Sequence, residues 1–232
     1  MAVVCGRYVV TRAVADLLPD LLADSGDLND DYNVAPTALV PVVRERHEQR
    51  AVTRASWGFL PGWAKDARAK PQPINARLET VGASGMFRRA FAQARCVVPA
   101  IGYYEWTITA GGKQPHFIGA PDAALAMAGV LSAWADPALP RDDPDRWRLS
   151  MAIITRDAHV APGEVHDRMP ACLTPDGYDE WLRADSSPDQ LLRLLEAESM
   201  QVAETLTHYE VDRAVGNVRN NSPDLIRPLA TG

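Results

Sequence analysis

The stretch CVVPAIGYYEW, residues 96–106, is an apolar and aromatic run of the kind that forms a β-strand. It opens a series of predicted strands at about 95–108, 115–120, 124–134 and 148–156. Gly111-Gly112 and Pro121-Asp122 supply turns within this series. Consecutive strands with such short connections favour a mainly antiparallel sheet.

Further elements lie on both sides of this series. Upstream, the pattern predicts strands at 38–46 and 50–59, and a helix over 85–94 with Ser84 as its cap. The other predicted elements are helices at 13–24 (interrupted near Pro19), 175–184 and 188–198, a strand near 205–212 and a surface loop at 136–145. Strands flanked by helices in this way indicate an α+β fold, with residues 1–232 as a single domain.

Composition is that of an ordinary globular protein, with 47% apolar and 23% charged residues in a chain of 232. No run of about 18 apolar residues predicts a membrane span, and the amino terminus does not read as a secretion signal. Cys5, Cys96 and Cys172 are too widely spaced for a disulfide framework or a metal knuckle. A cytoplasmic, reduced protein is expected.

Charge is distributed unevenly, although the net charge is only −6. Residues 44–95 hold eleven Lys/Arg against four acidic residues, a net charge of +7, which leaves −13 for the rest of the chain. Clustered cations attract phosphate even in an acidic protein. The alternative is an ordinary solvated face, and charge alone does not decide between them.

Cys5 lies close to the amino terminus, in Cys5-Gly6-Arg7-Tyr8. A cysteine that becomes the first residue carries a thiol and an α-amine, with ordinary pKa values of about 8.5 and about 8. Such a pair condenses with an aldehyde: the amine forms an imine, and the thiol closes a five-membered thiazolidine ring. Met1–Val4 precede Cys5 and would have to be absent for this chemistry.

Asn75-Ala76-Arg77-Leu78-Glu79-Thr80 places polar residues at alternate positions, which share one face of an extended segment. Arg77 would then bind a phosphate, Asn75 a sugar or an amine, and Glu79 would hold the arginine in place. A surface strand with a salt bridge explains the pattern equally well.

Glu105 and His166 are candidates for proton transfer. Glu105 lies in the aromatic strand, where burial would raise the pKa of its carboxyl towards that of a general acid or base; a strand end facing water is the alternative. His166 lies in a loop beside Arg168. The other four histidines are expected to have no functional role, and no histidine pair has metal-ligand spacing, so no metal site is predicted.

Trp57–Asp66 (WGFLPGWAKD) combines two tryptophans with Lys65. Nucleic-acid bases stack on exposed indoles near a cation, so the segment suits single-stranded DNA. Tryptophans that form part of the core or of a hydrophobic lid are the alternative.

Taken together, these segments resemble the SOS response-associated peptidase (SRAP) family of abasic-site processing proteins. The resemblance covers nearly the whole chain. Its motifs are Cys5–Tyr8, Tyr32–Thr37, Trp57-Gly58 with Trp63, Asn75–Thr80, Pro99 with Glu105-Trp106, His166–Pro170 and Val215–Asn220. It implies the SRAP fold, in which a barrel-like sheet is flanked by helices.

The resemblance also implies a function and a set of site residues. A protein of this family would bind single-stranded DNA and capture the aldehyde of an abasic site on Cys5. By carry-over, Asn75 would position the amine, Glu105 would transfer protons and His166 would stabilise the opened sugar or its phosphate. The implied DNA contacts are Arg7, Arg77 and Arg168 for phosphates, with Asn33 and Trp63 along the channel.

Other expectations follow from the resemblance: no cofactor, a monomer associated with the nucleoid, and replication-fork machinery as a candidate partner. Autopeptidase and lyase-type activities belong to the same expectation. Two departures stand out. The family generally has its cysteine directly after the initiator methionine, so either Val4 is the start or Met1–Val4 are excised. Gly85 stands where some members carry a basic residue, which implies one fewer phosphate contact.

Three hypotheses remain open from the sequence. The first is a DNA-repair protein that forms a thiazolidine crosslink. The second is a cysteine peptidase or amidohydrolase that uses Cys5, His166 and Glu105 on proteins or amides. The third is a non-catalytic single-strand binder that uses only its arginines and tryptophans.

Overall fold

The structure is a computed structural model that describes residues 5–21, 28–47, 49–183 and 185–230. Met1–Val4, which the sequence analysis expects to be removed or not translated, lie outside the described residues. Within the predicted helix 13–24, the described part forms only helix α1 (Val14–Leu17). Pro19 lies two residues beyond the end of this helix, and helical backbone is disfavoured at the residue before a proline.

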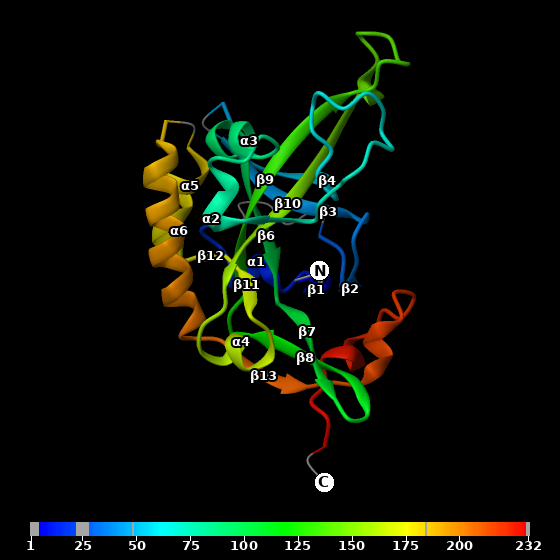
Figure 1. The fold of residues 1–232 in the computed structure, drawn as a ribbon, viewed down its shortest axis with the longest axis vertical. Coiled ribbons are helices and arrows are strands. Elements are labelled where there is room, and N and C mark those ends of the chain that lie inside the picture. The colour runs from blue at the N-terminus through cyan, green and yellow to red at the C-terminus, as the bar shows by residue number, and fades with distance from the viewer. Residues whose placement is uncertain (1–4, 22–27, 48, 184, 231–232) are drawn as a thin grey trace.

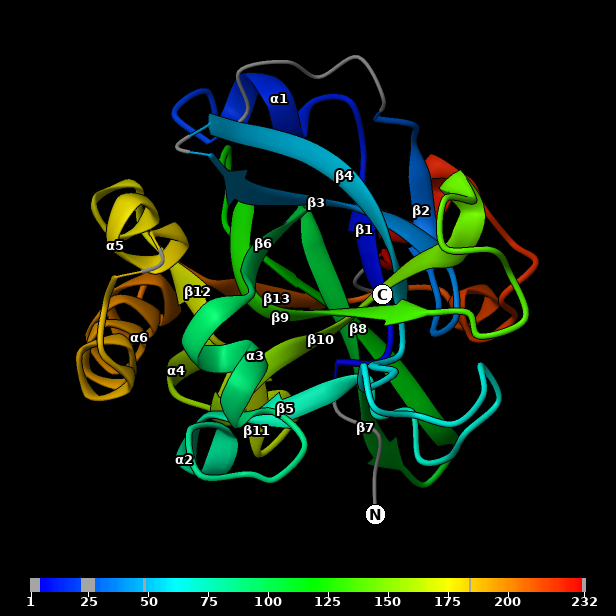
Figure 2. The ribbon, with the colours of Figure 1, turned by 90° about the horizontal axis from the view of Figure 1, so that it is seen from above.

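A closed ring of five strands forms the centre of the described structure (Figures 1 and 2). Its members are β9 (Leu125–Ala135), β10 (Trp147–Asp157), β4 (Gln49–Trp57), β3 (Leu39–Arg46) and β6 (Arg95–Ala100). The ring closes because β10 pairs with both β4 and β9. Three short strands extend it: β5 (Asn75–Arg77) and β11 (Arg168–Pro170) beside β10, and β12 (Cys172–Leu173) beside β9.

A second sheet lies across one end of the barrel (Figure 1). Its strand order is β13 (Thr207–Glu210), β8 (Gly112–Gly119), β7 (Gly102–Thr109), β1 (Tyr8–Val10) and β2 (Asp31–Val34). All its pairings are antiparallel, whereas in the barrel β10 runs parallel to β4 and to β5. The predicted α+β fold with a mainly antiparallel, barrel-like sheet is confirmed.

The strand predicted at 95–108 is two strands, one in each sheet. β6 ends at Ala100 and β7 begins at Gly102, so the chain passes from the barrel to the second sheet at Ile101. Tyr103 then packs into the main core while Tyr104 packs into a smaller cluster on the other face of the second sheet. Successive side chains of β7 point to opposite faces of the second sheet, so β7 contributes to both apolar cores. The same alternation decides which of its side chains face the barrel.

Helices cover the outside of the barrel (Figure 1). α5 (Tyr178–Leu182) and α6 (Pro188–Ala203) lie together on one side, and Ser187 with Gln190 forms a capping box at the start of α6. The short helices α2 (Leu78–Val81), α3 (Arg88–Gln93) and α4 (Val160–Val165) lie around the barrel and the second sheet, where they pack against strands. None of the helices in the described ranges is long and apolar enough to cross a membrane.

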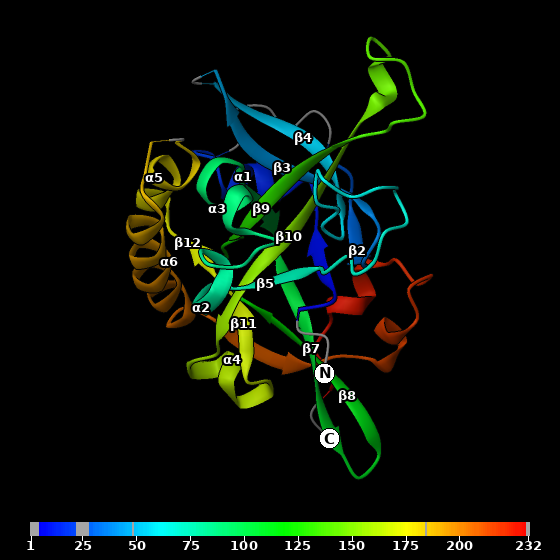
Figure 3. The same ribbon diagram turned by 45° about the horizontal axis from the view of Figure 1, so that its top comes forward.

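The prediction that Ser84 caps a helix over 85–94 was wrong. The helix begins only at Arg88, its N-cap position is Phe87, and no side chain caps it. The Ser84 hydroxyl instead accepts the backbone N–H of Met86 in the turn before the helix. The predicted loop at 136–145 joins β9 to β10 at the tip of a long hairpin that reaches away from the barrel (Figure 3). The loop contains the 3₁₀ turn Pro144–Arg146.

A substitution at Gly102 tests how tightly the junction between the two sheets is packed. A Cβ atom at this position would lie 2.4 Å from the Phe117 ring and 2.5 Å from the Ile118 carbonyl oxygen. Gly102→Ala should therefore lower the free energy of unfolding by about 2–3 kcal/mol, because the Ile118 carbonyl belongs to the backbone of β8 and cannot move away without disturbing the β7–β8 pairing. Urea denaturation measures the change. Gly85→Ala is the matched control, since a Cβ there meets open space; equal unfolding midpoints for the two variants would contradict the tight packing.

Candidate functional site

Cys5 lies just before β1, in the interior of the protein, with no exposed surface. Its backbone nitrogen donates a hydrogen bond to Oε1 of Glu105 at 2.5 Å. Its φ of 44° is in the left-handed region, which a residue with a side chain adopts only where the surroundings impose it. The fold thus brings the nitrogen of Cys5 directly onto the carboxyl that the sequence marked for proton transfer.

Glu105 occupies the middle of β7 and is only 2% exposed. Burial raises the pKa of its carboxyl to about 7, although hydrogen bonds from the backbone of Cys5 and Trp106 partly offset this, and the nearby Asp167 charge adds to the rise. The prediction that Glu105 is buried with a raised pKa is confirmed. A carboxyl that titrates near neutral pH can both give and take a proton.

The thiol of Cys5 is not activated in this conformation. Burial, together with the charges of Glu105 and Cys172, raises its pKa well above the ordinary value. Nucleophilic cysteines in peptidases show the opposite shift, because a nearby cation or helix N-terminus stabilises the thiolate. In this conformation burial therefore favours the neutral thiol of Cys5, and a neighbouring group would have to take its proton.

Two buried tyrosines next to this contact were not singled out from the sequence. Tyr8 of β1 lies opposite Tyr103 of β7, so both rings are on the face of the sheet that carries Glu105. Within the described ranges neither hydroxyl has a hydrogen-bond partner. The signal in the sequence is the alternation Tyr103, Glu105, which places both side chains on one face of a strand.

β5 brings Asn75 and Arg77 next to β10, where Asn75 lies opposite Ile153 and Arg77 opposite Thr155. The prediction that Glu79 shares this extended face and holds Arg77 was wrong. The chain turns into helix α2 at Leu78, which carries Glu79 away from the strand. Arg77 remains exposed, and Asn75 is half-buried.

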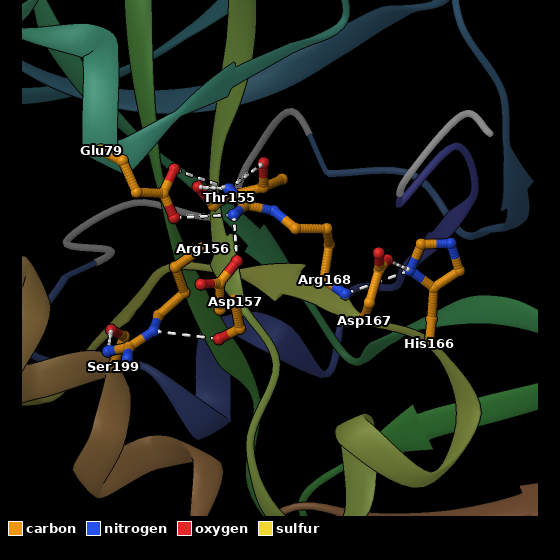
Figure 4. Close-up of polar contacts among 8 residues, drawn as sticks. All are labelled: Glu79, Thr155, Arg156, Asp157, His166, Asp167, Arg168 and Ser199. Carbon is orange, nitrogen blue, oxygen red and sulfur yellow. Dashed lines mark hydrogen bonds and ion pairs between the residues drawn. The ribbon is translucent and has the colours of Figure 1, made fainter. Parts of the chain in front are cut away.

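Arg168, at the start of β11, is the arginine that Glu79 holds (Figure 4). Its two terminal nitrogens reach both Glu79 carboxylate oxygens at 2.7 and 3.1 Å, Asp157 Oδ1 at 2.6 Å and the Thr155 carbonyl at 2.6 Å. A bidentate pair with a second carboxylate leaves little capacity for a phosphate. The structure thus places Arg168 in a network that ties α2, β10 and β11 together, rather than on a free surface.

His166 follows helix α4 as its C-cap residue, and only 16% of its side chain is exposed. Nδ1 lies 3.1 Å from the backbone nitrogen of Arg168 and 2.8 Å from Oδ1 of Asp167 (Figure 4). Nδ1 can accept from the first when it carries no proton and donate to the second when it carries one, so it has a partner with either placement of the ring proton.

Arg7 and Asn33 contact each other, with Arg7 Nη1 donating to Asn33 Oδ1 at 2.8 Å. Asn33 is only 4% exposed, and its side-chain nitrogen donates to three backbone carbonyls, those of Val215, Asn217 and Asn220. The expectation that Asn33 lines an open channel does not fit this burial. Its amide anchors the 215–220 segment, because the backbone carbonyls of that segment need hydrogen-bond donors and Asn33 supplies them.

The basic segment and its tryptophans divide between structure and surface. Trp63 is 70% exposed, whereas Trp57 is buried and donates Nε1–H to the Ile74 carbonyl. Arg95 is buried and donates to the backbone carbonyls that end α3 and α5, and Arg50 pairs with Asp179. Part of the +7 charge is therefore structural, while Arg77 and Trp63 stay at the surface.

The described residues thus combine a closed barrel with a buried cysteine whose nitrogen contacts a buried carboxyl of raised pKa. The chain belongs to the SOS response associated peptidase (SRAP) family, whose model matches residues 4–218. Similar proteins include the abasic site processing proteins YedK of Escherichia coli, 33% identical over 97% of this chain and 100% of its own length, and YoqW of Bacillus subtilis, 31% identical over 96% and 98%.

Solved structures support the same fold. A Bacteroides thetaiotaomicron protein superposes with a TM-score of 0.72 at 24% identity, covering 88% of each chain. A phage-related protein of Bordetella bronchiseptica superposes with a TM-score of 0.68 at 26% identity, covering 90% of this chain and 95% of its own.

The raised pKa of Glu105 predicts that the free energy of unfolding depends on pH. Because the folded-state value of about 7 lies above the ordinary 4.5, Glu105 contributes stability below about pH 4.5 that is lost as the pH rises through 7. Glu105→Gln removes this loss, so its free energy of unfolding relative to the unsubstituted chain should rise by up to about 3 kcal/mol between pH 4 and pH 8. Urea denaturation across that pH range measures it. A difference that does not vary with pH would contradict the raised pKa.

Proposed function

We propose that this protein captures abasic sites in single-stranded DNA by forming a thiazolidine between Cys5 and the aldehyde of the opened deoxyribose. The single observation that carries the proposal is the 2.5 Å contact between the Cys5 nitrogen and Glu105. Family relatives named abasic site processing proteins, similar over nearly the whole chain, support the substrate.

The chemistry needs a proton carrier at the nitrogen of Cys5. Once that nitrogen is a free amine, it adds to the aldehyde to give a carbinolamine, and loss of water gives an imine. The thiol then adds to the imine carbon, and its proton ends on the nitrogen, which closes the ring. Glu105 lies where it can take the proton of the ammonium group and return one to the departing hydroxyl, and burial, which raises the pKa of its carboxyl, suits a group that both takes and gives a proton.

Other residues would orient the amine and bind the opened sugar and the DNA strand. Asn75, beside β10, would orient the amine, and His166 would donate to the opened sugar or its phosphate. Arg77 and Trp63 are exposed and would hold a phosphate and a base, while half-buried Arg7 would contact a phosphate next to the lesion. Arg168 and Asn33, whose polar groups are engaged within the protein, would act by holding this frame in place.

The reaction requires that the nitrogen of Cys5 be an amine and not part of a peptide bond. Translation from Val4 with removal of the initiator residue would produce it, as would excision of Met1–Val4. The positive φ of Cys5 and its contact with Glu105 favour excision, since backbone strain and a carboxyl group that accepts from the Cys5 N–H then lie at the bond to be broken.

A peptidase acting on other proteins is the alternative function. The buried thiol of Cys5, whose pKa burial raises, argues against it, because a general cysteine peptidase needs an accessible thiolate. Turnover of a peptide substrate without DNA would favour the peptidase.

The experiment uses a single-stranded oligonucleotide that contains one abasic site, incubated with the protein and resolved on a denaturing gel. The chain should form an adduct that survives denaturation, and Cys5→Ala should abolish it because both the thiol and its ring closure are lost. Cys96→Ala is the matched control, since Cys96 is equally buried but belongs to β6. Adduct formation by Cys5→Ala at the rate of the unsubstituted protein would rule the proposal out.

A further inference from the structure

A row of polar side chains crosses the face of the second sheet that carries Glu105. The strand register places His116 of β8 opposite Glu105 of β7, and Glu210 of β13 opposite His116. Directly opposite residues point to the same face, and so do residues two apart on one strand. His208, two residues before Glu210, therefore lies on this face as well, close to His116.

The two histidines form a continuous hydrogen-bonded chain. His116 Nε2 lies 3.0 Å from Thr107 Oγ1, and His116 Nδ1 lies 3.3 Å from Nδ1 of His208. His208 Nε2 in turn lies 3.0 Å from Oε2 of Glu164. The chain thus joins four elements: β7, β8, β13 and helix α4.

One assignment of protons satisfies every member of this chain. The Glu164 carboxylate can only accept, so His208 donates from Nε2 and its Nδ1 is free to accept. His116 then donates from Nδ1, and its Nε2 accepts the hydroxyl proton of Thr107. In this arrangement each imidazole carries one ring proton, and burial, aided by the nearby His208 and opposed by Glu210, lowers the pKa of His116.

Helix α4 depends on contacts of this kind for its position. It has only six residues and includes Pro162-Gly163, which are poor helix formers, so it is not stable by itself. It packs against β7, β11, β13 and α6, and Glu164 is its only side chain in the hydrogen-bonded chain (Figure 1 shows α4 beside β13). His166 follows Glu164 by two residues, and its backbone N–H closes the helix on the Pro162 carbonyl.

We infer that His208 and Glu164 are positioning residues for the crosslinking reaction: through His116 they hold α4, and with it His166, in a fixed place beside the strand that carries Glu105. The inference rests on the proposed function. It assigns a role to a histidine pair for which the sequence indicated none.

A merely structural role is a poor account of the Glu164–His208 contact. The Glu164 side chain is 71% exposed and that of His208 is 22% exposed. Side-chain contacts as exposed as this contribute little to the free energy of folding. Their removal should therefore change where α4 lies more than it changes stability.

The test measures the rate constant for adduct formation at saturating abasic single-stranded DNA. All variants are made in the full chain, and the active fraction is counted as the fraction whose mass begins at Cys5. His208→Phe and Glu164→Ala should each lower the rate constant about tenfold, because a small misplacement of a reacting group has effects of this size or larger. The Kd for an undamaged strand and the melting temperature should stay close to those of the unsubstituted chain. His159→Phe, an exposed histidine at the start of the same helix, is the matched control and should react normally.

A second comparison separates positioning from a general disturbance. In a His166→Ala background, neither His208→Phe nor Glu164→Ala should slow the reaction further, because their effect passes through His166. Full rates in both single variants, or the same loss with and without His166, would overturn the inference. Should His208→Phe fail to fold, exposed Glu164→Ala carries the test alone. Absence of any adduct with the unsubstituted chain would refute the proposed function itself, which distinguishes the two failures.

Discussion

The hydrogen bond from the Cys5 nitrogen to Glu105 is the contact on which the rest of the site depends. A carboxyl group 2% exposed among apolar side chains must find donors within the protein, and the backbone of Cys5 and Trp106 supplies them. The pairing of β1 with β7 brings Cys5, with its positive φ, onto this carboxyl. The pKa of Glu105 is nevertheless raised, since two backbone donors only partly offset the cost of burial. The same contact that stabilises the fold leaves a proton carrier on the nitrogen where the proposed reaction begins.

Much of this arrangement can be predicted from local sequence patterns. The alternation and aromatic content of residues 96–106 predicted both the strands and the burial of Glu105, because the environment of a strand residue is set largely by its neighbours. Closure of the barrel could not be predicted, since β10 pairs in parallel with β4, where Ser150 lies opposite Ser56, and with β5, where Ile153 lies opposite Asn75, and both strands are distant in the chain. The partner of Glu79 was missed for a related reason: the turn into α2 after Arg77 directs the carboxylate towards Arg168, which is 89 residues away.

Polar residues that look exposed in a sequence are the hardest to place. Asn33 was expected to line an open channel, yet its amide holds the backbone of the 215–220 segment. Arg95 belongs to the basic segment but caps two helix ends within the protein. His116 and His208 are 92 residues apart and acquire a relation only through the order of strands in the second sheet. In each case the partner is distant in the chain, so no local pattern marks it.

The central claim is that the Cys5 nitrogen, freed from its peptide bond, reacts with the aldehyde under the control of Glu105. The mass of the intact protein–DNA adduct tests it most directly. The account predicts the mass of residues 5–232 plus that of the abasic strand, less one molecule of water, because imine formation releases water and ring closure releases nothing. An adduct that retains Met1 or Ala2 at its amino terminus would contradict the account, since the Cys5 nitrogen would still be an amide.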